Sequence, residues 1–294
     1  MTSKLLNTNK DKSGKITVSV FLDRPNTQST PWIDFEAKVP DDMVCVGGGG
    51  TGAEVPKGAL LTASYPNEQT KGGWLVSTKD HIDPNPHVVQ AYAIGMKIDG
   101  MDIKDLKENV VFQRKNSNEV NHPEVTAVLP DGYSLLGGGF NIHYHPNKGN
   151  LATASFPESS ISWRAHSTDA QVSDPSVLTV YAAGIQTDLT TKDQAGHNVY
   201  FRTVTTTFQS AISSAKSHPF STANVLPGYA LCGGGAHVHH TFGVGNFLYS
   251  LEPTLTQSDE PTPQTLTARS KDHINPDPSI IDTYAMGIKL YSSI

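Results

Sequence analysis

Two short segments of the chain place histidines at alternate positions, a spacing that suits metal binding. One segment contains His143 and His145, and the other contains His237 and His239. Alternate residues of a β-strand share one face, with Cα atoms roughly 7 Å apart, so each pair could chelate zinc or copper. The competing interpretation is that these imidazoles are partly exposed polar groups on solvent-facing strands. The sequence offers four histidines as a further ligand, namely His122, His166, His197 and His218.

The alternation around His143 also predicts which neighbouring side chains share its face. Asn141 and His145 point the same way as His143 if the segment is a strand. Phe140, Ile142 and Tyr144 then point to the opposite side. His143 and His239 hold equivalent places after two similar glycine clusters, so the two segments are related.

A second pattern combines lysine, aspartate and histidine in a loop that begins near an Asp-Pro or Asn-Pro turn. It occurs twice, over residues 79–81 and 271–273. Such a loop offers hydrogen-bond donors and acceptors for sugar hydroxyls, and nearby tryptophan rings could stack on a sugar. The alternative is that these residues only initiate turns and cap their own loop. The candidate ligand-binding residues are Trp74, Lys79, Asp80, His81, Trp163, Lys271, Asp272 and His273.

Nucleophilic catalysis has little support in the sequence. No G-x-S-x-G elbow occurs, and the two cysteines, Cys45 and Cys232, lie in apolar surroundings at equivalent positions. We expect both to be small buried hydrophobic residues, with a disulfide between them as the alternative. An enzyme built on this chain would use metal-activated water on the histidine strands.

Composition excludes several classes of partner. The formal net charge is -6 and no run of lysine or arginine occurs, so nucleic acid and anionic membranes are disfavoured. No apolar run approaches transmembrane length, and residues 1–15 lack the apolar core of a signal peptide. We therefore expect a protein that is cytoplasmic, a mature secreted form, or exported by an unconventional route.

The elements that would position these residues occur three times. Glycine triplets begin at Gly47, Gly137 and Gly233, which lie 90 and 96 residues apart, and each repeat closes on a Tyr-Ala-x-Gly block. Self-similar units of this kind bury their apolar faces only against one another. We expect a single domain over residues 1–294, with repeats at about 14–103, 104–196 and 197–294.

Strand patterns dominate each repeat, and no helical period exceeds about two turns. The repeats open with strands expected at 16–22, 110–114 and 199–208, and close with strands at 88–98, 177–187 and 280–290. The closing strands are apolar on both faces, which predicts burial between two layers. Their repeated alanine and glycine, as at Ala93 and Gly95, should allow close packing around a central axis. A bulge or a crowded strand start best explains the glycine triplets.

Several separated blocks resemble a known family. They include Leu60 to Pro66 with the preceding glycines, Trp74, Ser77 to His81 and Ala91 to Gly95. These blocks are similar to repeats of bacterial secreted proteins and to the C-terminal β-prism-like recognition modules of MACPF-type insecticidal proteins. The resemblance implies a threefold all-β fold that recognises cell-surface molecules such as glycans, and a link to toxins or defence. The chain departs from it by lacking a MACPF segment and the Lys-Asp-His motif of the middle repeat.

The sequence thus predicts an all-β, pseudo-threefold, β-prism-like protein with three antiparallel multi-stranded units around a central axis. Its expected function is non-enzymatic binding of a glycan or cell-surface receptor, at two or three similar sites. The alternative is a metal-dependent enzyme with one site made from His143, His145, His237 and His239. A purely structural scaffold is the third possibility, and the oligomeric state stays open.

Overall fold

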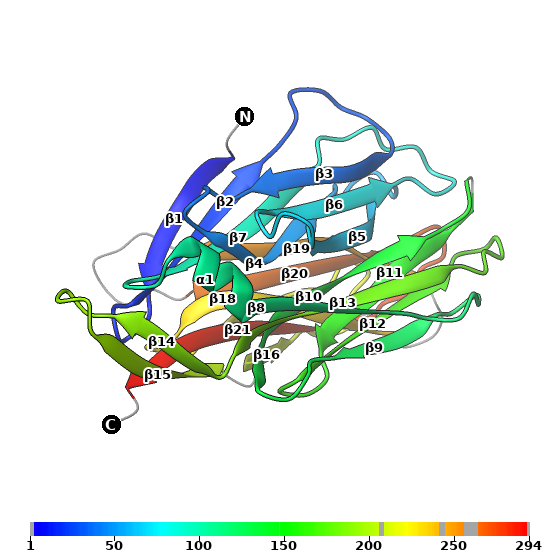
Figure 1. Ribbon diagram of the computed structural model, residues 1–294. Coiled ribbons are helices and arrows are strands. Elements are labelled where there is room, and N and C mark those ends of the chain that lie inside the picture. Colours follow the sequence, from blue (N-terminus) through cyan, green and yellow to red (C-terminus); the bar gives the residue numbers. More distant parts are fainter. Residues whose placement is uncertain (1–2, 147, 206–208, 241–244, 256–263, 293–294) are drawn as a thin grey trace.

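The structure is a computed structural model that describes residues 3–146, 148–205, 209–240, 245–255 and 264–292 (Figure 1). These residues form twenty-one β-strands and one short helix, α1 (Ile103–Asn109). The expectation of an all-β protein is confirmed at this level. The strands are described below by the sequence repeat to which they belong, called repeats 1, 2 and 3.

Repeat 1 supplies the first seven strands of the chain. They are β1 (Lys4–Lys10), β2 (Ile16–Asp23), β3 (Trp32–Lys38), β4 (Val44–Thr51), β5 (Leu60–Pro66), β6 (Gly73–Lys79) and β7 (Gln90–Ile98). Repeat 2 contributes β8 (Val110–Asn116), β9 (Glu124–Val128), β10 (Tyr133–His143), β11 (Asn150–Pro157), β12 (Ser162–Asp169), β13 (Val177–Gln186) and β14 (Asp188–Lys192). Repeat 3 contributes β15 (Asn198–Thr205), β16 (Gln209–Ile212), β17 (Phe220–Asn224), β18 (Ala230–His239), β19 (Asn246–Leu255), β20 (Gln264–Asp272) and β21 (Ile280–Ser292).

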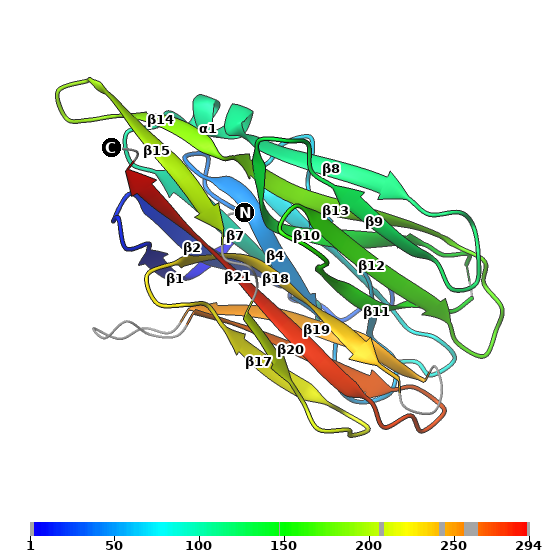
Figure 2. The same ribbon diagram turned by 90° about the horizontal axis from the view of Figure 1, so that it is seen from below.

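Each of the three sheets joins strands from two repeats. The first has the order β1-β2-β7-β4-β19-β20-β17, and the second has the order β3-β6-β5-β10-β13-β8. The third has the order β14-β15-β21-β18-β11-β12-β9, with β16 also paired to β21. In every sheet the glycine-rich strand of one repeat (β4, β10 or β18) pairs with the strand that follows the glycines in another repeat (β19, β5 or β11). Figure 2 shows β21 beside β18 through the middle of the molecule, with β17 and β20 along one edge.

The three contacts between repeats have equivalent registers, and we call them junctions. At the first junction Asn141 of β10 lies opposite Ala63 of β5. At the second junction His237 of β18 lies opposite Ala154 of β11. At the third junction Thr51 of β4 lies opposite Ser250 of β19. The opening strands stay within their own repeats, since β2, β8 and β15 pair with the closing strands β7, β13 and β21. The end of the expected strand 199–208 lies outside the described residues.

Each glycine of a triplet has its own packing role. In repeat 2, Gly138 lies against the ring of Trp163, Gly139 lies against β5, and Gly137 faces Gly233 of repeat 3. A Cβ on Gly233 would come within 2.9 Å of the Cα of Gly137, so glycine at this position lets the two backbones approach so closely. A register shift falls at the first glycine of all three triplets. The predicted bulge and the predicted crowding are both confirmed.

The alanine and glycine stripe of the closing strands has other neighbours than expected. A Cβ on Gly184 would meet Leu129, and one on Gly95 would meet Val39, so these glycines accommodate the segment before the glycine strand of their own repeat. The prediction that this stripe packs around a central axis is therefore wrong. The first glycines of the triplets occupy the place where the repeats converge.

One hydrophobic core includes residues from all three repeats. Cys45 and Cys232 belong to it with no solvent exposure, and both are free thiols, as the preferred interpretation predicts. Burial raises the pKa of the Cys45 thiol to about 12, which leaves it unreactive at neutral pH. A second, smaller cluster lies apart from this core, near the starts of β5, β11 and β19.

Candidate functional site

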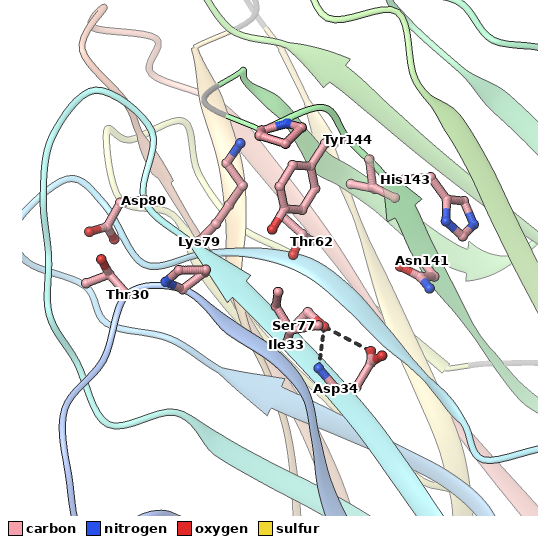
Figure 3. Close-up of a pocket in the computed structure, with 13 residues that line it drawn as sticks. Thr30, Ile33, Asp34, Thr62, Ser77, Lys79, Asp80, Asn141, His143 and Tyr144 are labelled. Atoms are coloured by element: carbon pink, nitrogen blue, oxygen red, sulfur yellow. Dashed lines mark hydrogen bonds between the residues drawn. The ribbon is translucent and has the colours of Figure 1, made fainter.

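A pocket of about 710 Å³ lies at the first junction, between repeats 1 and 2. Its walls come from β3, β5 and β6 of repeat 1 and from the end of β10 in repeat 2 (Figure 3). Polar side chains line much of it, and Figure 3 shows Asn141 and His143 of β10 on the opposite side of the pocket from Ser77 and Asp34. We call this cavity the junction pocket. A concave site with a few convergent polar groups is the usual form of a small-ligand site.

Asp34 is held in the junction pocket by an irregularity of the edge strand β3. The pairing of β3 with β6 shifts register between Trp32 and Phe35, and Asp34 has a φ of 50°, in the left-handed region that aspartate tolerates. Its backbone N–H donates to Ser77 Oγ at 2.9 Å, and Ser77 Oγ donates to Asp34 Oδ1 at 3.2 Å. The Tyr65 hydroxyl donates to the same oxygen at 2.9 Å. The carboxylate is thus oriented by protein groups and remains exposed.

Thr62 supplies the most unusual polar atom of the junction pocket. The residue is 1 % exposed, and its hydroxyl has no hydrogen-bond partner among the described residues. A buried hydroxyl without a partner costs about 1–3 kcal/mol, so such groups are rare unless a ligand or water completes them. Thr62 lies on β5 with its neighbours fully buried, which fixes the hydroxyl at the pocket wall.

Lys79 and Tyr144 form one wall of the junction pocket together. The ammonium of Lys79 lies 4.1 Å from the centroid of the Tyr144 ring and donates to the carbonyl oxygen of Lys148 in repeat 2. Burial lowers the pKa of Lys79 to about 8. Tyr144 reaches the pocket because β10 ends at His143, so the strand alternation predicted for this residue does not extend to it.

The Lys-Asp-His residues divide between the pocket and the interior. Lys79 and Asp80 line the junction pocket, as a binding role requires. Asp80 also accepts the backbone N–H groups of Ala59 at 2.9 Å and Asn85 at 2.5 Å, which is the turn-capping role of the alternative interpretation. His81 is 4 % exposed and turned inward.

The second Lys-Asp-His motif is structural in its contacts. Lys271 is fully buried, and its Nζ lies 2.5 to 3.0 Å from four carbonyl oxygens of the loop at 53–58, which share its three N–H donors. His273 is 1 % exposed, and Asp272 lies 3.4 Å from His218. Lys271 and His273 therefore face repeat 1, whereas Asp272 contacts a residue of its own repeat. The prediction that they bind an external ligand is wrong for Lys271 and His273.

The tryptophans cannot act as sugar-stacking rings. Trp74 is 1 % exposed and Trp163 is fully buried, each beneath the middle glycine of its own triplet. Their indole N–H groups donate to Ser64 Oγ and Ser155 Oγ, both at 2.9 Å. The prediction that they contact a ligand is wrong, because a large ring is needed to fill the space that each glycine leaves.

The four histidines proposed as metal ligands do not form one site. His143 bonds Thr179 Oγ1 at 2.8 Å, whereas His145 pairs with the buried Asp174 at 3.0 Å. His237 and His239 lie on β18 in the third sheet, with ring centroids 4.1 Å apart. In the part of the chain that the structure describes, no three His, Cys, Asp or Glu side chains are placed to share a metal ion. The single four-histidine site of the metalloenzyme hypothesis is therefore wrong.

At the second junction the equivalent space is filled by rings, which we call the ring cluster. His237 stacks on Phe156 with centroids 4.8 Å apart, and Tyr284 lies 5.7 Å from Phe156. His166 meets His237 edge-on at 5.3 Å, so one of the four predicted further ligands does approach this pair. Burial lowers the pKa of His237 to about 3 and that of His166 to about 4, so both rings are neutral at pH 7.

The other three histidines considered as further ligands have other partners. His122 contacts Thr168, His197 lies 3.3 Å from Asp193, and His218 lies 3.1 Å from Glu54. None of them approaches the ring cluster. Imidazoles with carboxylate or hydroxyl partners of this kind are ordinary surface polar groups.

The sequence did not single out Asp34, Thr62 or Ser77, although they define the junction pocket. The signal for Asp34 is weak, because it depends on a bulge that only strand pairing reveals. Thr62 and Ser77 lie within blocks that the family resemblance quotes, so they could have been considered. A comparison with models of known protein families and with curated protein sequences found no match. No helix among the described residues is long and apolar enough to cross a membrane.

Proposed function

We propose that this protein is a non-enzymatic binding protein that holds a glycan in the junction pocket. The observation that carries the proposal is the buried, unpartnered hydroxyl of Thr62, which lies in the same pocket as the oriented carboxylate of Asp34. A sugar presents hydroxyls that both donate and accept, so one ring can donate to Asp34 while it satisfies Thr62. The ring of Tyr144 offers an apolar surface beside them.

The same residues favour a neutral sugar. The Asp34 carboxylate has no lysine or arginine partner among the described residues, and the ammonium of Lys79 is already engaged by a carbonyl oxygen and the Tyr144 ring. An acidic sugar would therefore bring its charge toward an uncompensated carboxylate, which costs affinity. Asn141 adds an amide that can donate to one sugar hydroxyl and accept from another.

We further propose that the chain is a pseudo-threefold, β-prism-like recognition module for cell-surface molecules. Support for the symmetry comes from the equivalent strand orders of the three sheets and the equivalent registers at the junctions. Support for the biological role rests on the family resemblance alone, including its link to toxins or defence. The junctions differ in their side chains, so we expect one glycan per chain rather than two or three.

The first test is a screen of immobilised neutral and acidic oligosaccharides, followed by calorimetry with the best neutral ligand. Asp34→Asn should weaken binding at least about tenfold, because it removes a charge-assisted hydrogen bond. Glu124→Gln is the matched control, since Glu124 occupies the corresponding place in β9 and lines no part of the pocket. Wild-type affinity in Asp34→Asn, or no oligosaccharide bound at all, would remove the proposal.

Thr62→Val gives a second test, because it should raise the stability of the free protein and lower its affinity for the glycan. It keeps the side-chain volume and deletes the unpartnered hydroxyl, so the free protein should gain up to about 1 kcal/mol in unfolding free energy. The same change should weaken glycan binding several-fold, because the ligand loses its partner. Thr153→Val at the corresponding place in β11 should leave glycan binding unchanged. Loss of both stability and binding would indicate a structural role for Thr62 instead.

A further inference from the structure

The smaller apolar cluster closes one end of the molecule where all three repeats meet, and we call it the end cluster. Its members are Leu60, Leu151, Ala170, Phe247 and Tyr249. Two buried histidines at equivalent positions, His81 and His273, adjoin it. The His273 ring lies 6.3 Å from Phe247, and His81 Nε2 lies 2.6 Å from the carbonyl oxygen of Ala170.

Both histidines hold adjacent repeats together through one N–H each. His273 Nδ1 lies 3.2 Å from the carbonyl oxygen of Lys57, so Nδ1 carries the hydrogen and the bond joins repeat 3 to repeat 1. His81 Nε2 donates to Ala170 and joins repeat 1 to repeat 2. The remaining nitrogen of His273, Nε2, is buried and has no partner among the described residues. A second proton on this ring would therefore have no acceptor.

Positive charges already surround the two rings. The ring centroids of His81 and His273 are 5.5 Å apart, so each would feel the charge of the other. Lys79 at the end of β6 and Lys271 near the end of β20 each precede a histidine by two residues, and both are buried. Burial lowers the pKa of Lys79 to about 8 and that of Lys271 to about 7, so both ammonium groups are charged at the acid pH where the histidines would be protonated. Burial is the main cause that lowers the pKa of both histidines, that of His273 to about 4.

The carboxylates that face this region are engaged elsewhere or lie further out. Asp174, which faces His81, accepts from the backbone N–H of Asn150 at 3.0 Å and from His145. Asp83 faces His273, and both Asp80 and Glu54 face Lys271. None of these carboxylates accepts a hydrogen bond from either ring among the contacts of the described residues. Protonated histidines would thus be poorly compensated.

We propose that His81 and His273 form an acid-sensitive latch that opens this end of the molecule when both rings are protonated. Opening separates the loop at 53–58 and the segment at 148–151 from the Lys-Asp-His loops and exposes the end cluster. The middle repeat has Thr168 and Ala170 where the other repeats have the lysine and histidine, so it lacks the latch. Lys79 also lines the junction pocket, so opening should release the glycan, a consequence that rests on the proposed function.

The direction of the pH effect follows from proton linkage. The closed form binds fewer protons than the open form, because the pKa of each histidine is lower when closed than its ordinary value of about 6.5. The stability that the two neutral histidines contribute to the closed form is therefore complete above about pH 6.5 and is lost as pH falls toward 4. Opening is expected within this window and is reversed by neutralisation.

Hydrogen exchange of the ligand-free protein between pH 7 and pH 4, corrected for the intrinsic rate, tests the latch without reference to glycan binding. We expect amides of 53–58 and 148–151 to lose protection at least about tenfold more than those of β13. The double variant His81→Gln, His273→Gln should lose this pH dependence, whereas His197→Gln, an exposed control, should retain it.

Two outcomes would overturn the proposal. In the wild-type protein, unchanged protection at the end loops down to pH 4 would do so even if the double variant fails to fold. A uniform loss of protection over the whole chain would also do so, because it indicates global unfolding rather than a local latch. A latch that opens while the oligosaccharide screen finds no ligand would leave the inference standing and remove only the glycan function.

Discussion

The first and second junctions have the same backbone arrangement and differ in the side chains that occupy them. In both, a glycine-rich strand pairs with the next repeat in the same register, and an aromatic pair stacks beside the pairing. At the first junction Tyr65 stacks on Tyr181 with centroids 5.1 Å apart, and the small Asn141 leaves the junction pocket open. At the second, His237 replaces Asn141 and lies flat on Phe156. The difference teaches that the fold provides the position of a site, while a few side chains decide whether it is hollow.

The polar partners of the two junctions differ in the same way. Asp34 and Ser77 bond each other at the first junction and leave the carboxylate exposed. At the second, Arg164 donates to Glu158 at 2.6 Å and also contacts Glu124, so both carboxylates already have a cationic partner within the protein. Of these two junctions, the first therefore offers a ligand a carboxylate that no lysine or arginine of the described residues pairs with.

The largest effect should come from the shared scaffold. In Gly233→Val, the new Cβ would lie 2.5 Å from the carbonyl oxygen of Leu136 and 2.9 Å from the Cα of Gly137. Both neighbours are backbone atoms that cannot move aside, so we expect a loss of about 4 kcal/mol or more in unfolding free energy. Urea unfolding would measure it. Gly72→Ala is the control, because its Cβ would meet nothing closer than 3.7 Å, and a fully stable Gly233→Val would refute the convergence of the repeats.

Trp163→Ala should be the next largest change. The ring fills space beneath Gly138 and also approaches Gly235 at the second junction. Its removal leaves a cavity, which should lower the free energy of unfolding by about 3–5 kcal/mol. Chemical unfolding of the variant and the wild type provides the measurement. Glycan affinity should be unaffected in the folded fraction, and a variant of normal stability that loses glycan binding would contradict the buried role of this tryptophan.

Asn141→His gives the first junction the histidine that the second junction has at the equivalent position, His237. The imidazole should occupy the space beside Tyr65 and reduce glycan affinity about tenfold, which corresponds to about 1.4 kcal/mol. Calorimetry would give the affinity, and thermal unfolding should change little because the site is half-buried. The reverse change, His237→Asn, is the control and should leave binding at the first junction intact. Equal affinity in Asn141→His would show that this position does not decide whether the pocket is open.

The ring cluster should make stability depend on pH. His166 and His237 have pKa values lowered chiefly by burial, so they contribute stability that is complete above about pH 6.5 and is lost as pH falls toward 4 and 3. Unfolding at a series of pH values should show a shallower decline in His237→Gln than in the wild type. His143→Gln, at the first junction, is the comparison, and an identical decline in His237→Gln and the wild type would contradict the assignment.

The smallest effect should come from the surface charges of the second junction. Arg164 and its partners Glu124 and Glu158 are one-third to one-half exposed, so Arg164→Met should cost only about 0.5–1 kcal/mol. The loss should shrink in 1 M salt. A salt-independent loss would instead indicate that the alkyl chain of Arg164, rather than its charge, supports the junction.

Much of the architecture could be predicted from the sequence because packing constraints are periodic. The glycine triplets, the bulges, the buried closing strands and the two buried cysteines follow from residue size and alternation. The candidate site could be predicted only in part. Lys79, Asp80 and His143 were identified from residue type and line the junction pocket, but His273 and Lys271 carry the same chemistry and are buried.

By itself the sequence determined that three β units must pack on one another, because each repeats the same apolar faces and the same glycines. Only the tertiary structure decided that each sheet joins strands of two units and that Thr62, Asp34 and Asn141 line one pocket across a junction. It also decided that the tryptophans face inward. The physical reason is that these contacts join residues nearly 80 to more than 100 positions apart, or depend on a bulge, and local periodicity carries no information about either.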